Sequence, residues 1–235
     1  MEHGHSHAEI AARLAPRKQK RYLKDIVYGG IDGAVTTFAI VAGVEGAGFS
    51  PNIFVALGLA NIVADGFSMA AGNYAGTKAD LDDRHRLWAV EERHIREEPQ
   101  GERDELRAIL RMRGLEGQVL EDATEAISKN TPKWIELMLT DEYNLPRTNA
   151  DPIAAGIATF LAFLAAGIVP LLPFLLQADH SFRLSILMTA FVFFTIGAAK
   201  SRWSLAPWWR SGLETLFIGS LAASLAFVVG RIFHA

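Results

Sequence analysis

The 235-residue chain contains no cysteine. Disulfide bonds and thiolate-bound metals are therefore excluded, and any metal ion must be held by oxygen, imidazole or thioether ligands. The sequence also lacks a nucleophile and base arrangement and a phosphate-binding loop, so we do not expect an enzyme. Its paired carboxylates would support at most ferroxidase chemistry at a di-iron site.

Apolar residues make up 50% of the sequence, and they gather in long runs. Each run is close to the ~20 residues that a helix needs to cross a bilayer. We place the five runs at about residues 26–49, 51–77, 152–176, 182–200 and 212–233. The pattern predicts an all-α membrane protein with five transmembrane helices and membrane lipid around them.

Lysine and arginine are absent from the turn at residues 50–52 between the first two runs, whereas residues 1–25 hold a basic cluster. Positive charge favours the cytoplasmic side, so we expect a cytoplasmic N-terminus and, after five spans, a C-terminus outside. His3, His5 and His7 lie in this basic segment and either recruit metal weakly or have no role. We expect no nucleic-acid partner.

Acidic residues concentrate between the second and third runs, where we count 17 of the 26. Residues 78–150 therefore form a charged, cytoplasmic helical insert between helices 2 and 3. The expected organisation is a His/basic segment over 1–25, spans 1 and 2 over 26–77, the acidic metal-binding insert over 78–150, and spans 3 to 5 over 151–235.

The second run carries Asn61, Asp65 and Met69 at four-residue steps, which places them on one helical face. A carboxylate within hydrocarbon is costly and normally faces a protein interior or a water-filled pathway. Oxygen, amide and thioether groups together suit a borderline or late first-row divalent ion better than magnesium or calcium. We interpret this face as part of an ion path.

The first run adds Asp32 and Thr36, with small residues at Gly29 and Gly33 that let helices approach closely. Asp32 follows the basic cluster by two turns, so it should lie ~9 Å into the membrane. Two interpretations stay open. Asp32 either stays exposed to solvent at the cytoplasmic surface of the membrane, or faces Asp65 or Met69 across a helix pair or a dimer interface.

The insert repeats residues of metal-binding type at helical spacing. A solvated helix face explains any one acid, but carboxylates on facing helices of a bundle also build metal sites. The candidate ligands are the pairs Glu91 and His94, Glu102 and Glu105, and Met138 and Glu142.

These residues together resemble the vacuolar iron transporter family, also called the yeast calcium-sensitive cross-complementer family. The resemblance covers nearly the whole chain. It rests on Asp32-Gly33, the segment from Ser68 to Gly72, the acidic insert, Leu137-Met138 with Glu142, and the segment from Val169 to Pro173.

The resemblance implies a homodimer of five-helix subunits that moves Fe2+, and often Mn2+, out of the cytosol in exchange for protons. It assigns Asp32 and Met69 to a path at the dimer interface, and Glu91, Glu102, Glu105, Met138 and Glu142 to cytoplasmic metal binding. No permanently bound cofactor is implied. The insert could also take Zn2+ or Co2+.

Three positions depart from the family pattern. Asn61 stands where plant members often have glutamate, with an extra acid at Asp65; His94 occupies a slot expected to hold glutamate; and Leu139 replaces a common second methionine. The proton-coupling carboxylate and the metal preference of the insert are therefore open.

A different class of protein remains as an alternative, a membrane-anchored metal sensor or buffer that uses only the insert. An anchor would not need polar side chains inside the membrane. The sequence also shows no evident targeting signal, which favours a bacterial inner membrane over a vacuolar membrane.

Overall fold

The computed structural model describes residues 6–14, 22–145 and 150–233, and every regular element within them is helical. Five of its helices are long and apolar enough to cross a membrane: Leu23–Gly46, Asn52–Glu97, Pro152–Leu175, Ser181–Lys200 and Trp208–Ile232. The predicted all-α, five-span architecture is confirmed, and the protein is a multi-pass integral membrane protein. His3, His5 and most of the basic N-terminal cluster lie outside the described residues.

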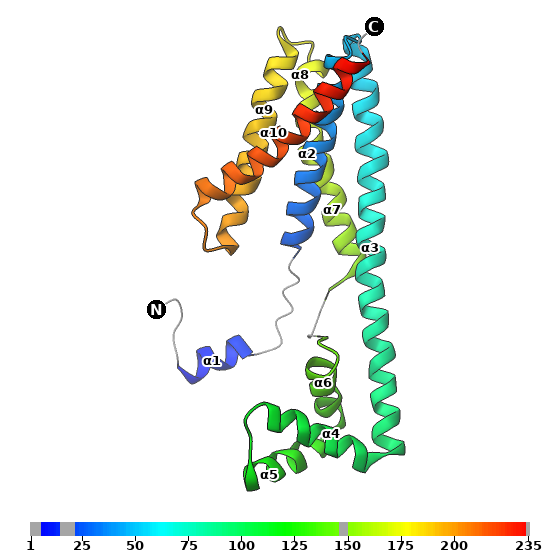
Figure 1. The fold of residues 1–235 in the computed structure, drawn as a ribbon, viewed down its shortest axis with the longest axis vertical. Helices are drawn as coiled ribbons and strands as arrows, with labels where there is room; N and C mark the ends of the chain where they lie inside the picture. Colours follow the sequence, from blue (N-terminus) through cyan, green and yellow to red (C-terminus); the bar gives the residue numbers. More distant parts are fainter. Residues whose placement is uncertain (1–5, 15–21, 146–149, 234–235) are drawn as a thin grey trace. The chain divides into compact units, whose positions relative to one another are not determined.

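The chain forms two compact units. The membrane unit comprises residues 19–75 and 151–235, and the insert unit comprises residues 1–18 and 76–150. The helix α3, Pro51–Glu97, contributes its first part to the membrane unit and its last part to the insert unit (Figure 1).

Helix α2, Leu23–Gly46, packs against α7, α9 and α10 of the membrane unit. These are Pro152–Gly167, Ser181–Lys200 and Trp208–Ile232. The predicted close approach at Gly29 and Gly33 is confirmed, because a Cβ atom at either position would collide with the backbone carbonyl of Thr159 or Phe163 on α7. The absence of a side chain thus lets α2 and α7 touch backbone to backbone.

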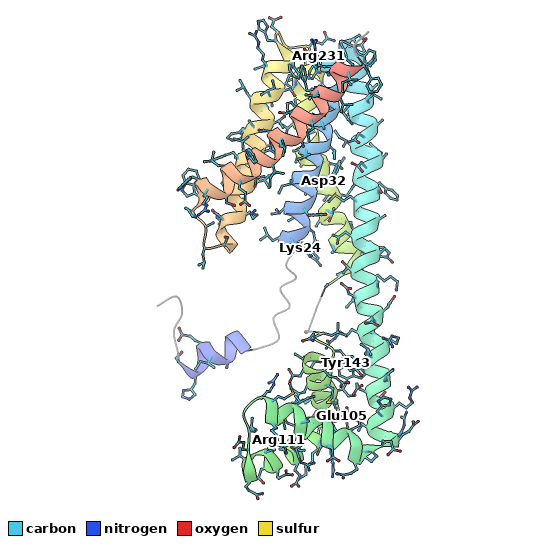
Figure 2. All side chains as sticks on the ribbon, viewed as in Figure 1. Lys24, Asp32, Glu105, Arg111, Tyr143 and Arg231 are labelled. Carbon is cyan, nitrogen blue, oxygen red and sulfur yellow. The ribbon has the colours of Figure 1, made fainter. Side chains whose placement is uncertain are left out.

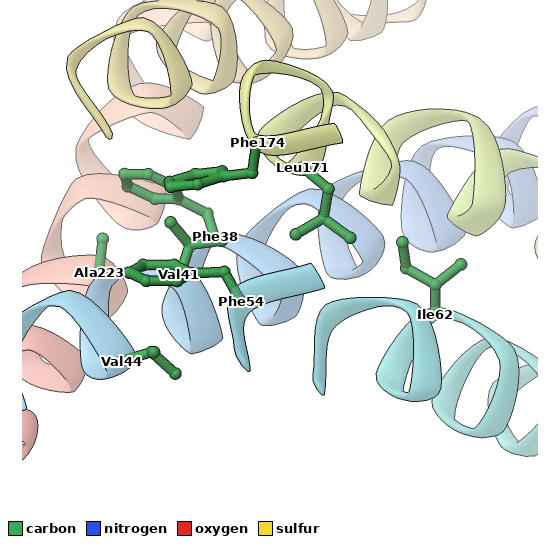
Figure 3. Packing of buried hydrophobic residues seen from close by; sticks show 8 residues of the cluster. All are labelled: Phe38, Val41, Val44, Phe54, Ile62, Leu171, Phe174 and Ala223. Carbon is green, nitrogen blue, oxygen red and sulfur yellow. The ribbon is translucent and has the colours of Figure 1, made fainter. Parts of the chain in front are cut away.

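A buried apolar cluster closes the membrane unit at the end where α2 and α3 are joined. Phe54 of α3 stacks on Phe174, with ring centroids 4.6 Å apart, and Val41 and Leu171 are fully buried beside them (Figure 3). Burying such side chains contributes roughly 1.5–3 kcal/mol each in water, and here their packing fixes how the helices meet.

The third span is interrupted, as its two prolines predict. After α7 the chain forms the 3₁₀ turn η1, Val169–Leu171, and the short helix α8, Leu172–Leu175. Ser185 Oγ on α9 donates to Pro170 O at this break at 2.7 Å, and the Ser181 hydroxyl shares its hydrogen between Ala178 O at 2.5 Å and Pro173 O at 3.2 Å. Proline lacks the N–H that a continuous helix would need, so the helix is interrupted at Pro170 and Pro173.

Three short helices complete the insert unit: α4, Pro99–Met112, α5, Gly117–Ser128, and α6, Thr131–Asp141. The short helix α1, His7–Leu14, precedes the first span, and the 3₁₀ turn η2, Ser201–Trp203, follows α9. Pro99 separates α3 from α4, because proline cannot continue the helix that precedes it. Asn130 caps α6, because its side chain accepts the Lys133 N–H, and Thr131 is the first helical residue.

Candidate functional site

The intramembrane candidates of α2 and α3 are linked by hydrogen bonds. Thr36 Oγ1 donates to the Asp32 carbonyl oxygen at 2.9 Å, and Asn61 Nδ2 donates to Thr36 Oγ1 at 3.3 Å. The Thr36 hydroxyl therefore connects the two helices, with the Asn61 amide on one side and the turn that carries Asp32 on the other.

The two acids of this region lie close enough for their negative charges to interact. Asp32 on α2 and Asp65 on α3 repel each other, and both residues are partly buried. Met69, also partly buried, follows Asp65 by one helical turn on α3. The structure thus brings Asp32, which Figure 2 labels on α2, together with Thr36, Asn61 and Asp65, and Met69 lies one turn beyond Asp65 on α3.

A second polar junction lies one more turn along α3, at Asn73. Its Nδ2 lies 2.8 Å from Asp25 Oδ1, 2.7 Å from Thr159 Oγ1 and 3.3 Å from the Ala155 carbonyl oxygen. An amide has two hydrogens for these three acceptors, so one hydrogen is shared. One side chain thereby joins α2, α3 and α7. The four-residue series from Asn61 to Met69 continues to Asn73, so the same spacing indicates this residue, although the expected ion path did not include it.

The candidate ligands of the insert unit gather around two buried carboxylates. Glu91 at the end of α3 is 1% exposed and Glu102 on α4 is 5% exposed. Tyr143 donates its hydroxyl to Glu91 Oε1 at 2.9 Å, and His94 Nδ1 lies 3.4 Å from Glu102 Oε1. The second carboxylate oxygen of each glutamate, Oε2, is buried without a hydrogen-bond partner among the described residues. Buried oxygens of this kind need a proton or a cation.

Glu105 and Glu142 lie close enough to Glu102 for their negative charges to raise its pKa. The pKa of Glu102 is raised to about 7, first by burial, then by the negative charges of Glu91, Glu105 and Glu142, and last by the hydrogen bond that a protonated Glu102 can donate to Glu91. The pKa of Glu142 is also raised, by partial desolvation and then by Glu91 and Glu105, although its side chain stays largely exposed. The negative charges of Glu91, Glu102, Glu105 and Glu142 therefore act on one another within one part of the insert.

Met138 lies apart from the polar side of this cluster. It is fully buried on α6, in an apolar core with Leu106, Leu110, Leu120 and Trp134. Its role as a metal ligand stays a prediction. Over residues 6–14, 22–145 and 150–233, no three His, Asp or Glu side chains lie close enough together to hold a metal ion.

We expect the stability of the insert to depend on pH through Glu102. The pKa of Glu102 in the folded protein, about 7, exceeds the ordinary glutamate value of 4.5, so its contribution to stability is fully present below pH 4.5 and is lost as the pH rises to about 7. Amide hydrogen exchange of α4 in the full-length, metal-free protein, corrected for intrinsic exchange, should show this decline. Glu102→Gln should flatten it, whereas Glu92→Gln, an exposed acid on α3, should not; an unchanged slope in Glu102→Gln would refute the assignment.

The chain is similar in sequence to known proteins, and the similarity covers both the membrane unit and the insert unit. The chain is 32% identical over 215 residues to vacuolar iron transporter 1 of Arabidopsis thaliana, covering 89% of this chain and 85% of that protein. It is 31% identical over 213 residues to vacuolar iron transporter 2 of Oryza sativa subsp. japonica, covering 89% and 86%. A third relative, the vacuolar iron transporter of Plasmodium berghei, is 30% identical over 223 residues, covering 90% and 82%.

These relatives are eukaryotic and are named for the vacuole, so the expectation of a bacterial inner membrane finds no support from them. The model of the VIT family matches residues 23–231, from the start of α2 almost to the end of α10. This span takes in Asp32, Asn61, Asp65 and Met69 as well as the acidic insert, and the resemblance read from the sequence is confirmed: the chain belongs to the VIT family.

Proposed function

We propose that this protein carries Fe2+ across the membrane along Asp32, Thr36, Asn61, Asp65 and Met69, in exchange for protons. Its family is one of transporters, so the protein is a membrane transporter of metal ions and not an enzyme. The observation that carries the proposal is the polar connection from Asp32 through Thr36 to Asn61, beside Asp65, inside two apolar spans. The iron in the names of its relatives supports ferrous iron as the cargo.

The charges at this site fit a divalent cation. Two carboxylates that repel each other across α2 and α3 lose that repulsion when a doubly positive ion lies between them. Each carboxylate can instead take up a proton, so metal and proton compete for the same oxygens. Met69 adds a soft donor that favours Fe2+ or Mn2+ over Mg2+ and Ca2+. When a metal ion replaces a proton at these carboxylates, and a proton later replaces the metal ion, the two ions cross the membrane in opposite directions.

Direction follows from the proposed topology. Lys24 at the start of α2 and Lys200 at the end of α9 lie at one end of the membrane unit, with Arg202 and Arg210 close in sequence. Basic residues favour the cytoplasmic side, which would place the insert there and the C-terminus outside. In this orientation the insert collects metal from the cytosol through Glu91, Glu102, Glu105, Glu142 and His94, and the path exports or sequesters it. Mn2+, Zn2+ and Co2+ are the other ions that this donor set could accept.

A metal sensor or buffer is the less favoured function. Such a protein would use the spans only as an anchor, and an anchor gains nothing from carboxylates and an amide placed within hydrocarbon, where each is costly. The polar connection from Asp32 to Asn61 therefore argues for passage of an ion rather than for storage alone.

The test is transport by the full-length protein in sealed proteoliposomes, with Fe2+ entry and internal pH recorded together. We expect Fe2+ to enter and protons to leave in proportion, at a rate that a pH gradient accelerates. Metal entry without any proton movement would contradict proton exchange and would indicate a uniporter. Metal that binds the protein without reaching the vesicle interior would instead support the sensor or buffer.

We also propose that two copies associate through α3. Its exposed face combines small residues with larger apolar ones, among them Ala64, Ala71 and Gly72 beside Val63 and Phe67, which are 61% and 68% exposed. Small residues on a spanning helix allow a second helix to approach closely. Asp65 lies on the same helix and would then be near the interface.

The absence of native cysteine makes this association simple to test. We expect Ala64→Cys to form a disulfide-linked dimer in the membrane under mild oxidation, seen as a doubled mass on a non-reducing gel. Phe217→Cys on α10, where the native side chain is 70% exposed, should stay monomeric. Equal cross-linking of both variants would mean random collision, and no cross-linking at residue 64 would argue against association through this face.

A further inference from the structure

A groove opens in the membrane unit where the beginning of α2 lies beside the end of α9 and the first half of α10. It has a volume of about 710 Å³. Its α2 wall is one continuous stripe at helical spacing, formed by Lys24, Val27, Tyr28, Ile31, Asp32 and Val35. Ile218 of α10 lies opposite, so most of the lining is apolar.

Cations lie at one end of this groove. Lys24 is the second residue of α2, and Lys200 is the last residue of α9. Ser204, just after η2, adds a hydroxyl to the same lining. Lys200 is held only loosely, because its nearest carboxylate oxygen, on the exposed Glu214, is 3.9 Å away. Two lysines and a serine thus line the groove together with its apolar residues.

The dimensions of the groove match one leaflet of a bilayer. From Lys24 to Val35 the stripe rises ~16 Å along α2, about half of the ~30 Å hydrocarbon core. Trp208 and Trp209 at the start of α10 are 60% and 51% exposed, at the same end as Lys200. Exposed tryptophans are typical of the headgroup level, which places the two lysines there and the apolar wall among the acyl chains.

We propose that this groove binds an anionic phospholipid, with its phosphate between Lys24 and Lys200 and an acyl chain along Val27, Ile31 and Ile218. Free phosphate would leave the apolar wall exposed, and an apolar side chain of a second copy would leave the lysines without a counter-charge. A phospholipid supplies a negative phosphate for the lysines and an acyl chain for the apolar wall. Basic pockets between spanning helices bind anionic lipid headgroups in this way. The bound acyl chain covers the α2 face that carries Asp32, and so keeps water away from this side of the carboxylate.

The test measures binding to delipidated, full-length protein in mild detergent, without metal, so its result is independent of the transport proposal. The probes are dioctanoylphosphatidylglycerol, dioctanoylphosphatidylcholine and glycerol 3-phosphate. We expect the anionic lipid to bind at least tenfold more tightly than either of the others. Lys24→Gln with Lys200→Gln should weaken it about 30-fold, and arginine at both positions should restore binding.

The control pair is Arg183→Gln with Arg231→Gln, which removes the same charge from the opposite ends of α9 and α10. Figure 2 shows Arg231 at the end of the membrane unit away from Lys24, and both arginines are exposed. This pair should bind the anionic lipid like the unmodified protein. Ile218→Trp fills the apolar wall without touching the lysines and should also weaken lipid binding.

Three outcomes would overturn the proposal. Glycerol 3-phosphate that binds as tightly as the lipid would indicate a site for free phosphate. Equal binding of both lipids, unaffected by the lysine variants, would indicate an unspecific apolar surface. If the double lysine variant and the double arginine variant lose binding equally, the effect would come from the net charge of the protein and not from this groove.

Discussion

Asp32→Asn is expected to reduce both Fe2+ entry and proton exit in proteoliposomes to the level of protein-free vesicles. Asparagine keeps the size of the side chain but loses the negative charge that holds the cation and the site that exchanges a proton. The hydrogen bond from Thr36 goes to the backbone carbonyl of residue 32, so the link between α2 and α3 is retained. The loss should therefore be one of transport and not of folding.

The matched control for this variant is Glu214→Gln. Glu214 is also a carboxylate in a spanning helix, but its side chain is 63% exposed, lies 3.9 Å from Lys200 and is not one of the proposed path residues. It should transport at the rate of the unmodified protein. Gel filtration and thermal unfolding should be the same for all three proteins. Transport that persists in Asp32→Asn would refute the assignment of the path.

Gly33→Ala is expected to destabilise the membrane unit by about 1–3 kcal/mol, the usual cost of overfilling a packed interior. The added methyl group would collide with the backbone carbonyl of Phe163, which cannot rotate away as a side chain would. Helices α2 and α7 would have to separate, and that separation would disturb the neighbouring Thr36. Thermal unfolding in detergent, followed by circular dichroism, measures the effect.

Gly76→Ala provides the comparison, because a Cβ atom at this position of α3 meets nothing within 4 Å. Alanine is the better helix former by roughly 0.5–1 kcal/mol, so this variant should unfold at the same or a higher temperature. A similar loss of stability in both variants would show that the contact between α2 and α7 is not the cause. An unchanged melting temperature in Gly33→Ala would contradict the close packing itself.

Much of the fold could be read from the sequence because apolar runs and prolines act locally. The five runs gave five spanning helices, Pro99 separated α3 from α4, and Pro170 with Pro173 interrupted the third span. The cap of α6 is harder to assign from the sequence, because Asn130 and Thr131 are both good caps and only the backbone geometry distinguishes them.

The site was harder to predict because it depends on which helices meet. Four-residue spacing aligned Asn61, Asp65 and Met69, but it could not reveal that Asn73 reaches Asp25 and Thr159 on two other helices. Spacing also could not distinguish the buried Glu102 from the exposed Glu105 on the same helix. Nor could it show that Met138 packs among leucines, since a thioether suits a core as well as a metal.

The interrupted third span has a consequence for how the protein is made. The carbonyls of Pro170 and Pro173 accept hydrogen bonds from Ser185 and Ser181, which belong to α9 and are synthesised later. When the third span first enters the bilayer, these hydroxyls have not yet left the ribosome. The break thus receives its side-chain donors only when the fourth span inserts beside it, and the two spans mature as a pair.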